Sequence, residues 1–107
     1  MQPLAAVRNP LLDKPAMRLI TDAELEQLEG AYADRARLAG EIGFDAIDLK
    51  MCHGYLINEL LAAHLREGPY GGPLENRTRL VRNALARIRE ATGGGLLLAV
   101  RLSGFRA

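Results

Sequence analysis

A lysine and a histidine stand three residues apart in the run Lys50-Met51-Cys52-His53, directly after an apolar segment. At the end of a strand, this spacing allows both side chains to point into one pocket. A lysine cation and an imidazole donor together would polarise a substrate carbonyl and stabilise negative charge that develops on its oxygen. The alternative is a lysine that extends into solvent next to a loop histidine. The pair therefore indicates either an oxyanion-binding site or an ordinary polar surface.

Tyr55 follows two residues after His53. A phenol with an ordinary pKa near 10 is protonated at neutral pH, as a proton donor must be. The alternative is an aromatic side chain packed on a short helix, which the sequence predicts within Tyr55–Ala63.

Cys52 has no second cysteine and no local histidine or cysteine at metal-ligand spacing, so we expect a small packed residue and no metal site.

Two apolar segments, Phe44–Met51 and Leu96–Ser103, predict the strands that position these residues. A helical segment joins them, and strands connected in this way form a parallel pair with a right-handed crossover more readily than a hairpin. The carboxyl ends of parallel strands are where α/β folds keep their chemistry. The sequence thus predicts part of an active site at the ends of two parallel strands.

Alternation along the strands separates an apolar face from a face that becomes polar toward the carboxyl end. We expect the apolar face to pack under helices and the other face to line the inner wall of a barrel at its mouth. The apolar face carries Ile47, Leu49, Met51, Leu98, Val100 and Leu102, and the opposite face carries Ala46, Asp48, Lys50, Leu97, Ala99 and Arg101.

Two amphipathic helices are predicted. The first begins at a capping box, Thr21 to Glu24, and stops at Gly43; the second covers about Asn76–Ala91 and ends at a run of three glycines. Residues 1–20 contain three prolines and predict an irregular segment ahead of a domain over residues 21–107. The expected inward residues are Leu25, Leu28, Tyr32, Ala36, Ala39 and Ile42 in the first helix, and Leu80, Val81, Ala84, Leu85 and Ile88 in the second.

Composition limits the class of protein. With 107 residues, 49% hydrophobic and 25% charged, the chain is at most one globular domain. A net charge of +1 gives no electrostatic reason to expect nucleic acid or an anionic membrane as a partner. A single cysteine, no apolar run of about 18 residues and no signal-like start make the cytoplasm the expected location. Two strands leave sheet edges unpaired, so we expect self-association or the remainder of a larger barrel as the partner.

Three motifs occur in order: His53-Gly54-Tyr55-Leu56, Tyr70-Gly71-Gly72-Pro73-Leu74-Glu75-Asn76-Arg77 and Val100-Arg101-Leu102-Ser103. Together they resemble the old yellow enzyme family of flavin-dependent oxidoreductases, over roughly Asn9–Ser103. The resemblance implies an α/β fold that is a partial (β/α)8 TIM barrel, from the third helix to the fifth strand. Two residues depart from the family pattern. Lys50 stands where the family commonly has a first histidine, and Pro73 replaces a serine.

The resemblance also implies a function: FMN as cofactor, NADH or NADPH as reductant, and an ene-reductase-like transfer of hydride to a small alkene activated by a carbonyl, such as an enoate, enone or dienoyl compound. By the same resemblance Tyr55 is the proton donor to the α-carbon, Lys50 and His53 bind the carbonyl oxygen, and Arg101 contacts the pyrimidine edge of the flavin. The glycines and the Glu-Asn-Arg run are expected to be structural. The alternative is a catalytically inactive barrel segment that serves only as a structural or assembly piece.

Overall fold

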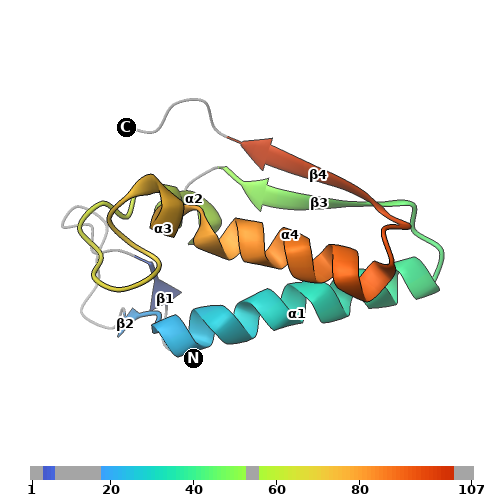
Figure 1. The fold of residues 1–107 in the computed structure, drawn as a ribbon, viewed down its shortest axis with the longest axis horizontal. Coiled ribbons are helices and arrows are strands. Elements are labelled where there is room, and N and C mark those ends of the chain that lie inside the picture. The colour runs from blue at the N-terminus through green and yellow to red at the C-terminus, as the bar shows by residue number, and fades with distance from the viewer. Residues whose placement is uncertain (1–3, 7–17, 53–55, 103–107) are drawn as a thin grey trace.

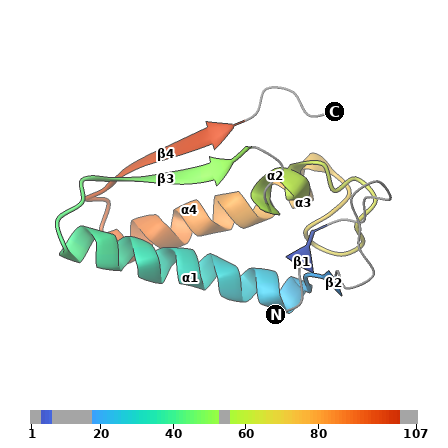
Figure 2. The same cartoon turned by 180° about the vertical axis from the view of Figure 1, so that it is seen from behind.

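The computed structural model describes residues 4–6, 18–52 and 56–102 (Figure 1). Two strands form a layer over two long helices, and the short elements gather at the end toward which the strands point (Figures 1 and 2). In chain order the elements are β1 Leu4–Ala5, β2 Arg18–Leu19, α1 Asp22–Glu41, β3 Ala46–Met51, α2 Leu56–Leu61, α3 Leu74–Arg77, α4 Arg79–Thr92 and β4 Leu97–Leu102.

Strands β3 and β4 are parallel and in register from Ala46 opposite Leu97 to Met51 opposite Leu102. The predicted parallel pair joined through a helix is therefore confirmed, with each strand slightly shorter than predicted. Backbone pairing continues just before β3, where the N–H of Leu97 donates to the carbonyl oxygen of Asp45 at 3.0 Å. Because the pairing is parallel, both strands end on the same side of the layer.

The amino end of α1 confirms the predicted capping box. The N–H of Glu24 donates to Oγ1 of Thr21 at 3.1 Å, and the N–H of Thr21 donates to Oε1 of Glu24 at 3.0 Å. Arg18 donates to both carboxylate oxygens of Glu24, at 2.7 and 2.9 Å. These bonds, first from Arg18 and then from Thr21, lower the pKa of Glu24 to about 2. At the other end, Gly43 adopts a φ of 104°, which explains why the helix stops there.

The buried stripe of α1 differs in part from the predicted one. Its buried residues are Leu25, Glu29, Ala33 and Ala36, whereas Ile42 is 66% exposed. The prediction was wrong for Ile42, which lies past the last helical residue, and it missed Glu29 and Ala33. The prediction considered apolar residues only, so it could not include Glu29, whose carboxylate is buried where α1 packs on α4.

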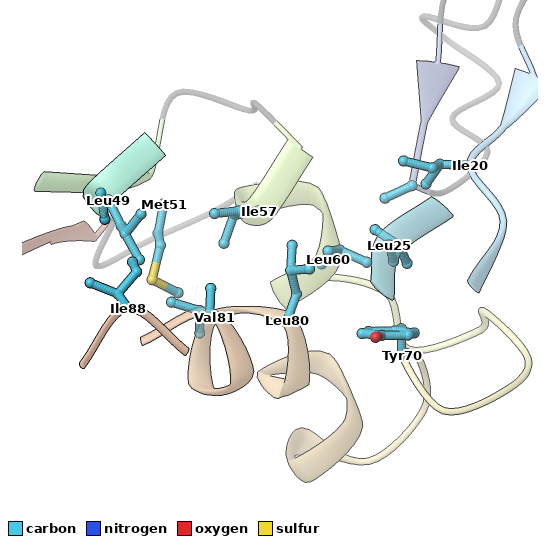
Figure 3. Packing of buried hydrophobic residues seen from close by; sticks show 13 residues of the cluster. Ile20, Leu25, Leu49, Met51, Ile57, Leu60, Tyr70, Leu80, Val81 and Ile88 are labelled. Atoms are coloured by element: carbon cyan, nitrogen blue, oxygen red, sulfur yellow. The ribbon is translucent and has the colours of Figure 1, made fainter. Parts of the chain in front are cut away.

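Helix α4 buries four of its five predicted inward residues, and the fifth, Leu85, is partly buried against the core. The helix predicted as one piece is divided at Thr78 into α3 and α4. Figure 3 shows the core between the helices, the apolar face of β3 and the short helix α2. The core cluster comprises Ala6, Ile20, Leu25, Ala36, Leu49, Met51, Ile57, Leu60, Tyr70, Leu80, Val81, Ala84 and Ile88.

The segment before α1, predicted to be irregular, contains one short parallel pair, with Leu4 opposite Arg18 and Ala5 opposite Leu19. Arg66 holds this segment in place. Its Nη1 donates to the carbonyl oxygen of Ala6 at 2.8 Å, and its Nη2 donates to that of Ile20 at 2.7 Å. Strands of two residues depend on such a tertiary anchor, which no local pattern reveals. Among the described residues, no helix combines the length and the apolar character needed to cross a membrane.

Candidate active site

Lys50 and Arg101 face each other across the two parallel strands, near the carboxyl end of each. The opposite face of β3 is buried against the helices through Leu49 and Met51, which are 4% and 6% exposed. Because side chains alternate along a strand, Lys50 and Arg101 lie on the face that the helices do not cover. The predicted assignment of the two faces of β3 is thereby confirmed. The structure brings together one cation from each strand.

Asp48 joins this pair on the uncovered face. Its Oδ2 lies 2.7 Å from Nε of Arg101, and both side chains are accessible, 44% for Asp48 and 58% for Arg101. Sequence reasoning placed Asp48 on the same face as Lys50 but did not identify it as the partner of Arg101. The sequence could have indicated this ion pair. Asp48 and Lys50 share a face by alternation, and the parallel register places Arg101 opposite Lys50.

His53 and Tyr55 lie outside the described residues, so their predicted roles stay predictions. The structure describes their neighbours: Cys52 is buried and Leu56 begins α2. The small packed role predicted for Cys52 is confirmed. Within the described residues, no cluster of three or more histidine, cysteine, aspartate or glutamate side chains has the arrangement of a metal site.

The glycine loop before α3 is held by the side chains that follow it. Asn76 donates through Nδ2 to the carbonyl oxygen of Gly71 at 2.9 Å. Arg77 donates to the carbonyl oxygens of Gly72 and Leu61, at 2.9 and 2.6 Å. The contact with Leu61 fastens the loop to the end of α2, the helix that follows the segment with His53 and Tyr55. The predicted structural role of the loop glycines and of the Asn-Arg pair is confirmed.

A buried carboxylate connects this loop to both long helices. Glu29 on α1 is 1% exposed, and its Oε2 accepts from the hydroxyl of Tyr70 at 2.8 Å and from Nδ2 of Asn83 at 2.9 Å. Arg87 on α4 lies 3.8 Å from its other oxygen. The sequence analysis missed Glu29, although it lies four residues from Leu25 on the buried stripe. A buried charge of this kind persists only with such partners.

Replacing Tyr70 by phenylalanine is expected to lower the free energy of unfolding by about 1–2 kcal/mol at pH 7, because Glu29 loses a buried donor. Burial first and Glu29 second raise the pKa of Tyr70 well above its usual value near 10. The unfolded chain therefore releases the phenolic proton at lower pH than the folded chain, and Tyr70 makes stability fall as the pH rises above about 10. Denaturant unfolding of the parent and of Tyr70→Phe measures this effect. The variant should have the lower free energy of unfolding at pH 7, and the difference between the two proteins should be smaller at about pH 10.5.

The matched control for this measurement is Tyr32→Phe. Tyr32 is partly buried against the core but makes no hydrogen bond to another described residue through its hydroxyl. Its replacement should cost less at pH 7. Equal costs for the two variants would contradict the role of the Glu29–Tyr70 bond.

Comparison with known proteins places these features in a family. The sequence model of the NADH:flavin oxidoreductase / NADH oxidase family matches residues 5–107. An NADPH dehydrogenase of Geobacillus thermodenitrificans is 36% identical over 93 residues, which are 85% of this chain and 27% of that protein. A 4,4'-dithiodibutanoate disulfide reductase of Rhodococcus erythropolis is 32% identical over 97 residues, covering 86% of this chain and 24% of its own length. The chain spans about a quarter of the length of these relatives.

Solved structures agree with this result. The old yellow enzyme homologue of Zymomonas mobilis is 32% identical and superposes with a TM-score of 0.77, over 95% of this chain and 32% of the other. Morphinone reductase superposes with a TM-score of 0.81 over the same shares at 22% identity, which supports the fold alone. The predicted fold class, a partial (β/α)8 barrel with parallel strands, is confirmed. The chain belongs to the NADH:flavin oxidoreductase / NADH oxidase family, whose members use FMN with NADH or NADPH as reductant.

Proposed function

We propose that this chain supplies part of the active site of an FMN-dependent oxidoreductase that uses NADH or NADPH to reduce an alkene activated by a carbonyl. One observation carries the proposal. Lys50 and Arg101 lie opposite each other near the carboxyl ends of two parallel strands, on the face that the helices leave uncovered. In barrel folds this is the face and the end at which ligands bind.

The donor set at this place fits a flavin. The Arg101 guanidinium forms an ion pair with Asp48 through Nε, and the Arg101 side chain is 58% exposed. A planar, exposed cation with two terminal donor groups matches the acceptor edge of the flavin pyrimidine ring. A fixed cation there also stabilises negative charge on the reduced ring. When bound, FMN supplies the hydride transfer from the nicotinamide to the β-carbon of the alkene.

The remaining roles belong to the end of β3 and the residues after it. Lys50 and His53 donate to the carbonyl oxygen of the substrate and stabilise the enolate charge that forms there. Tyr55 then gives its proton to the α-carbon. The alkene thus gains one hydride and one proton, and the tyrosine recovers its proton from solvent. Binding by a lysine and a histidine favours substrates with a strongly polarised or anionic oxygen.

A second candidate is a barrel segment that acts only in assembly. It is favoured by the apolar side chains that β4 exposes, since Leu97 is 73%, Val100 40% and Leu102 63% exposed. Such residues on a sheet edge that pairs with no further described strand suit pairing with other strands. The partner would be the remainder of a barrel or a second copy of this chain.

A chimera separates the two candidates. Residues 5–107, which the family model matches, replace the corresponding segment of the Geobacillus thermodenitrificans NADPH dehydrogenase, so that the chain is tested within a complete barrel. The active-site proposal expects a yellow protein that holds about one FMN per chain and oxidises NADPH with an enone as acceptor. A folded, FMN-loaded chimera that reduces no activated alkene would contradict the proposed chemistry, and the assembly candidate would take its place.

The 107-residue chain alone is expected to hold no stoichiometric FMN after gel filtration. Phosphate contacts supply much of the affinity for such a cofactor, and (β/α)8 barrels commonly bind phosphate after their last two strands. The matched segment corresponds to earlier strands. An absorbance spectrum of the purified chain, with and without added FMN, checks this expectation; a yellow chain that keeps its FMN would show that fewer elements suffice.

A further inference from the structure

An ion pair joins the two strands on the face that the helices leave uncovered. Oδ2 of Asp48 lies 2.7 Å from Nε of Arg101. In the strand register Asp48 is opposite Ala99, so the arginine reaches back across the ladder by two residues to meet it. The contact lies beside Lys50, on the strand end assigned above to ligand binding.

This contact orients the arginine more than it stabilises the fold. Both side chains are about half exposed, and an ion pair between exposed groups contributes little to stability. The two strands are already joined by backbone hydrogen bonds along the whole of β3 and β4. A carboxylate on Nε, however, limits the rotation of the planar guanidinium and leaves both terminal nitrogens as donors on the opposite edge.

The same carboxylate also offsets a like-charge pair. Lys50 and Arg101 face each other directly in the register, and like charges at such positions repel. Asp48 is two residues before Lys50 and on the same face. Its negative charge therefore allows two cations to lie at one strand end.

We infer that Asp48 is a positioning residue that directs the terminal nitrogens of Arg101 toward the acceptor edge of the flavin. The inference rests on the proposed function, since it requires Arg101 to contact FMN. The two terminal nitrogens of Arg101 would bind a planar group with two neighbouring acceptors, such as a carbonyl oxygen next to a ring nitrogen.

The test measures FMN binding to the apo-chimera by quenching of flavin fluorescence, without turnover. Arg101→Met should weaken binding by about ten-fold or more, since a charge-assisted bond is lost. Asp48→Asn should weaken it by about three- to ten-fold. In the presence of Arg101→Met, however, Asp48→Asn should have no further effect, because there is no guanidinium left to orient. Asp48→Glu should restore most of the affinity.

A matched control removes the same charge elsewhere in the segment. Asp45 is exposed, lies just before β3 at the opposite end from Arg101, and contributes only its backbone carbonyl to the sheet. Asp45→Asn should leave FMN affinity unchanged. Equal weakening by Asp48→Asn with and without Arg101 would overturn the positioning role while leaving the proposed function standing. An Arg101→Met variant that binds FMN as tightly as the parent would instead overturn the assignment of Arg101 to the flavin, and this inference with it.

Discussion

Replacing Tyr55 by phenylalanine in the FMN-loaded chimera is expected to slow reduction of the alkene by about 10²- to 10⁴-fold, the usual contribution of a positioned general acid. Reduction of the flavin by NADPH should proceed at the parent rate, because that step needs no proton at the α-carbon. The two half-reactions are followed separately by stopped-flow absorbance of the flavin. The effect should therefore appear only when the alkene reoxidises the reduced protein.

Two comparisons sharpen this result. His53→Ala is expected to slow the alkene half-reaction by on the order of 10²-fold, the cost of removing one donor to an oxyanion. It should also weaken the binding of phenol ligands, which Tyr55→Phe should not. If Tyr55→Phe reduces the alkene at the full rate, the proton-donor role is wrong, and a tyrosine packed on α2 takes its place.

Replacing Gly71 by alanine is expected to destabilise the chimera by about 3 kcal/mol or more, or to prevent its folding. A Cβ atom on Gly71 would overlap the carbonyl oxygen of Arg66 and lie 2.7 Å from its carbonyl carbon. The Arg66 backbone has little freedom to move, because its side chain is bound to Ala6, Ile20 and Asp22. Thermal unfolding of the purified variant measures the loss.

Gly95→Ala is the control for this substitution. A Cβ atom there would meet only the carbonyl oxygen of Thr92 at 3.5 Å, an ordinary contact, and Gly95 has no positive φ. The melting temperature of Gly95→Ala should stay close to that of the parent. A Gly71→Ala protein that melts with the parent would mean that the loop relaxes around the new methyl group, and the steric role assigned to Gly71 would be wrong.

Local patterns in the sequence were enough for the elements that organise the site. The capping box at Thr21, the stop at Gly43 and the alternation along β3 depend on neighbouring residues and on chain geometry, and the structure agrees with all three. The placement of Lys50 and Arg101 on one face also followed from alternation, once the two strands were taken as parallel. The roles of His53 and Tyr55 come from the motif resemblance and stay predictions.

Other features became visible only in the tertiary structure. The ion pair of Asp48 with Arg101, the burial of Glu29 against Tyr70, and the anchoring of the first segment by Arg66 each join residues 41 to 60 positions apart. The partner of a charged side chain depends on which distant segment packs beside it, and a periodic pattern records only whether a residue faces inward. Sequence alone therefore determined the elements and their faces, whereas packing decided which polar groups meet.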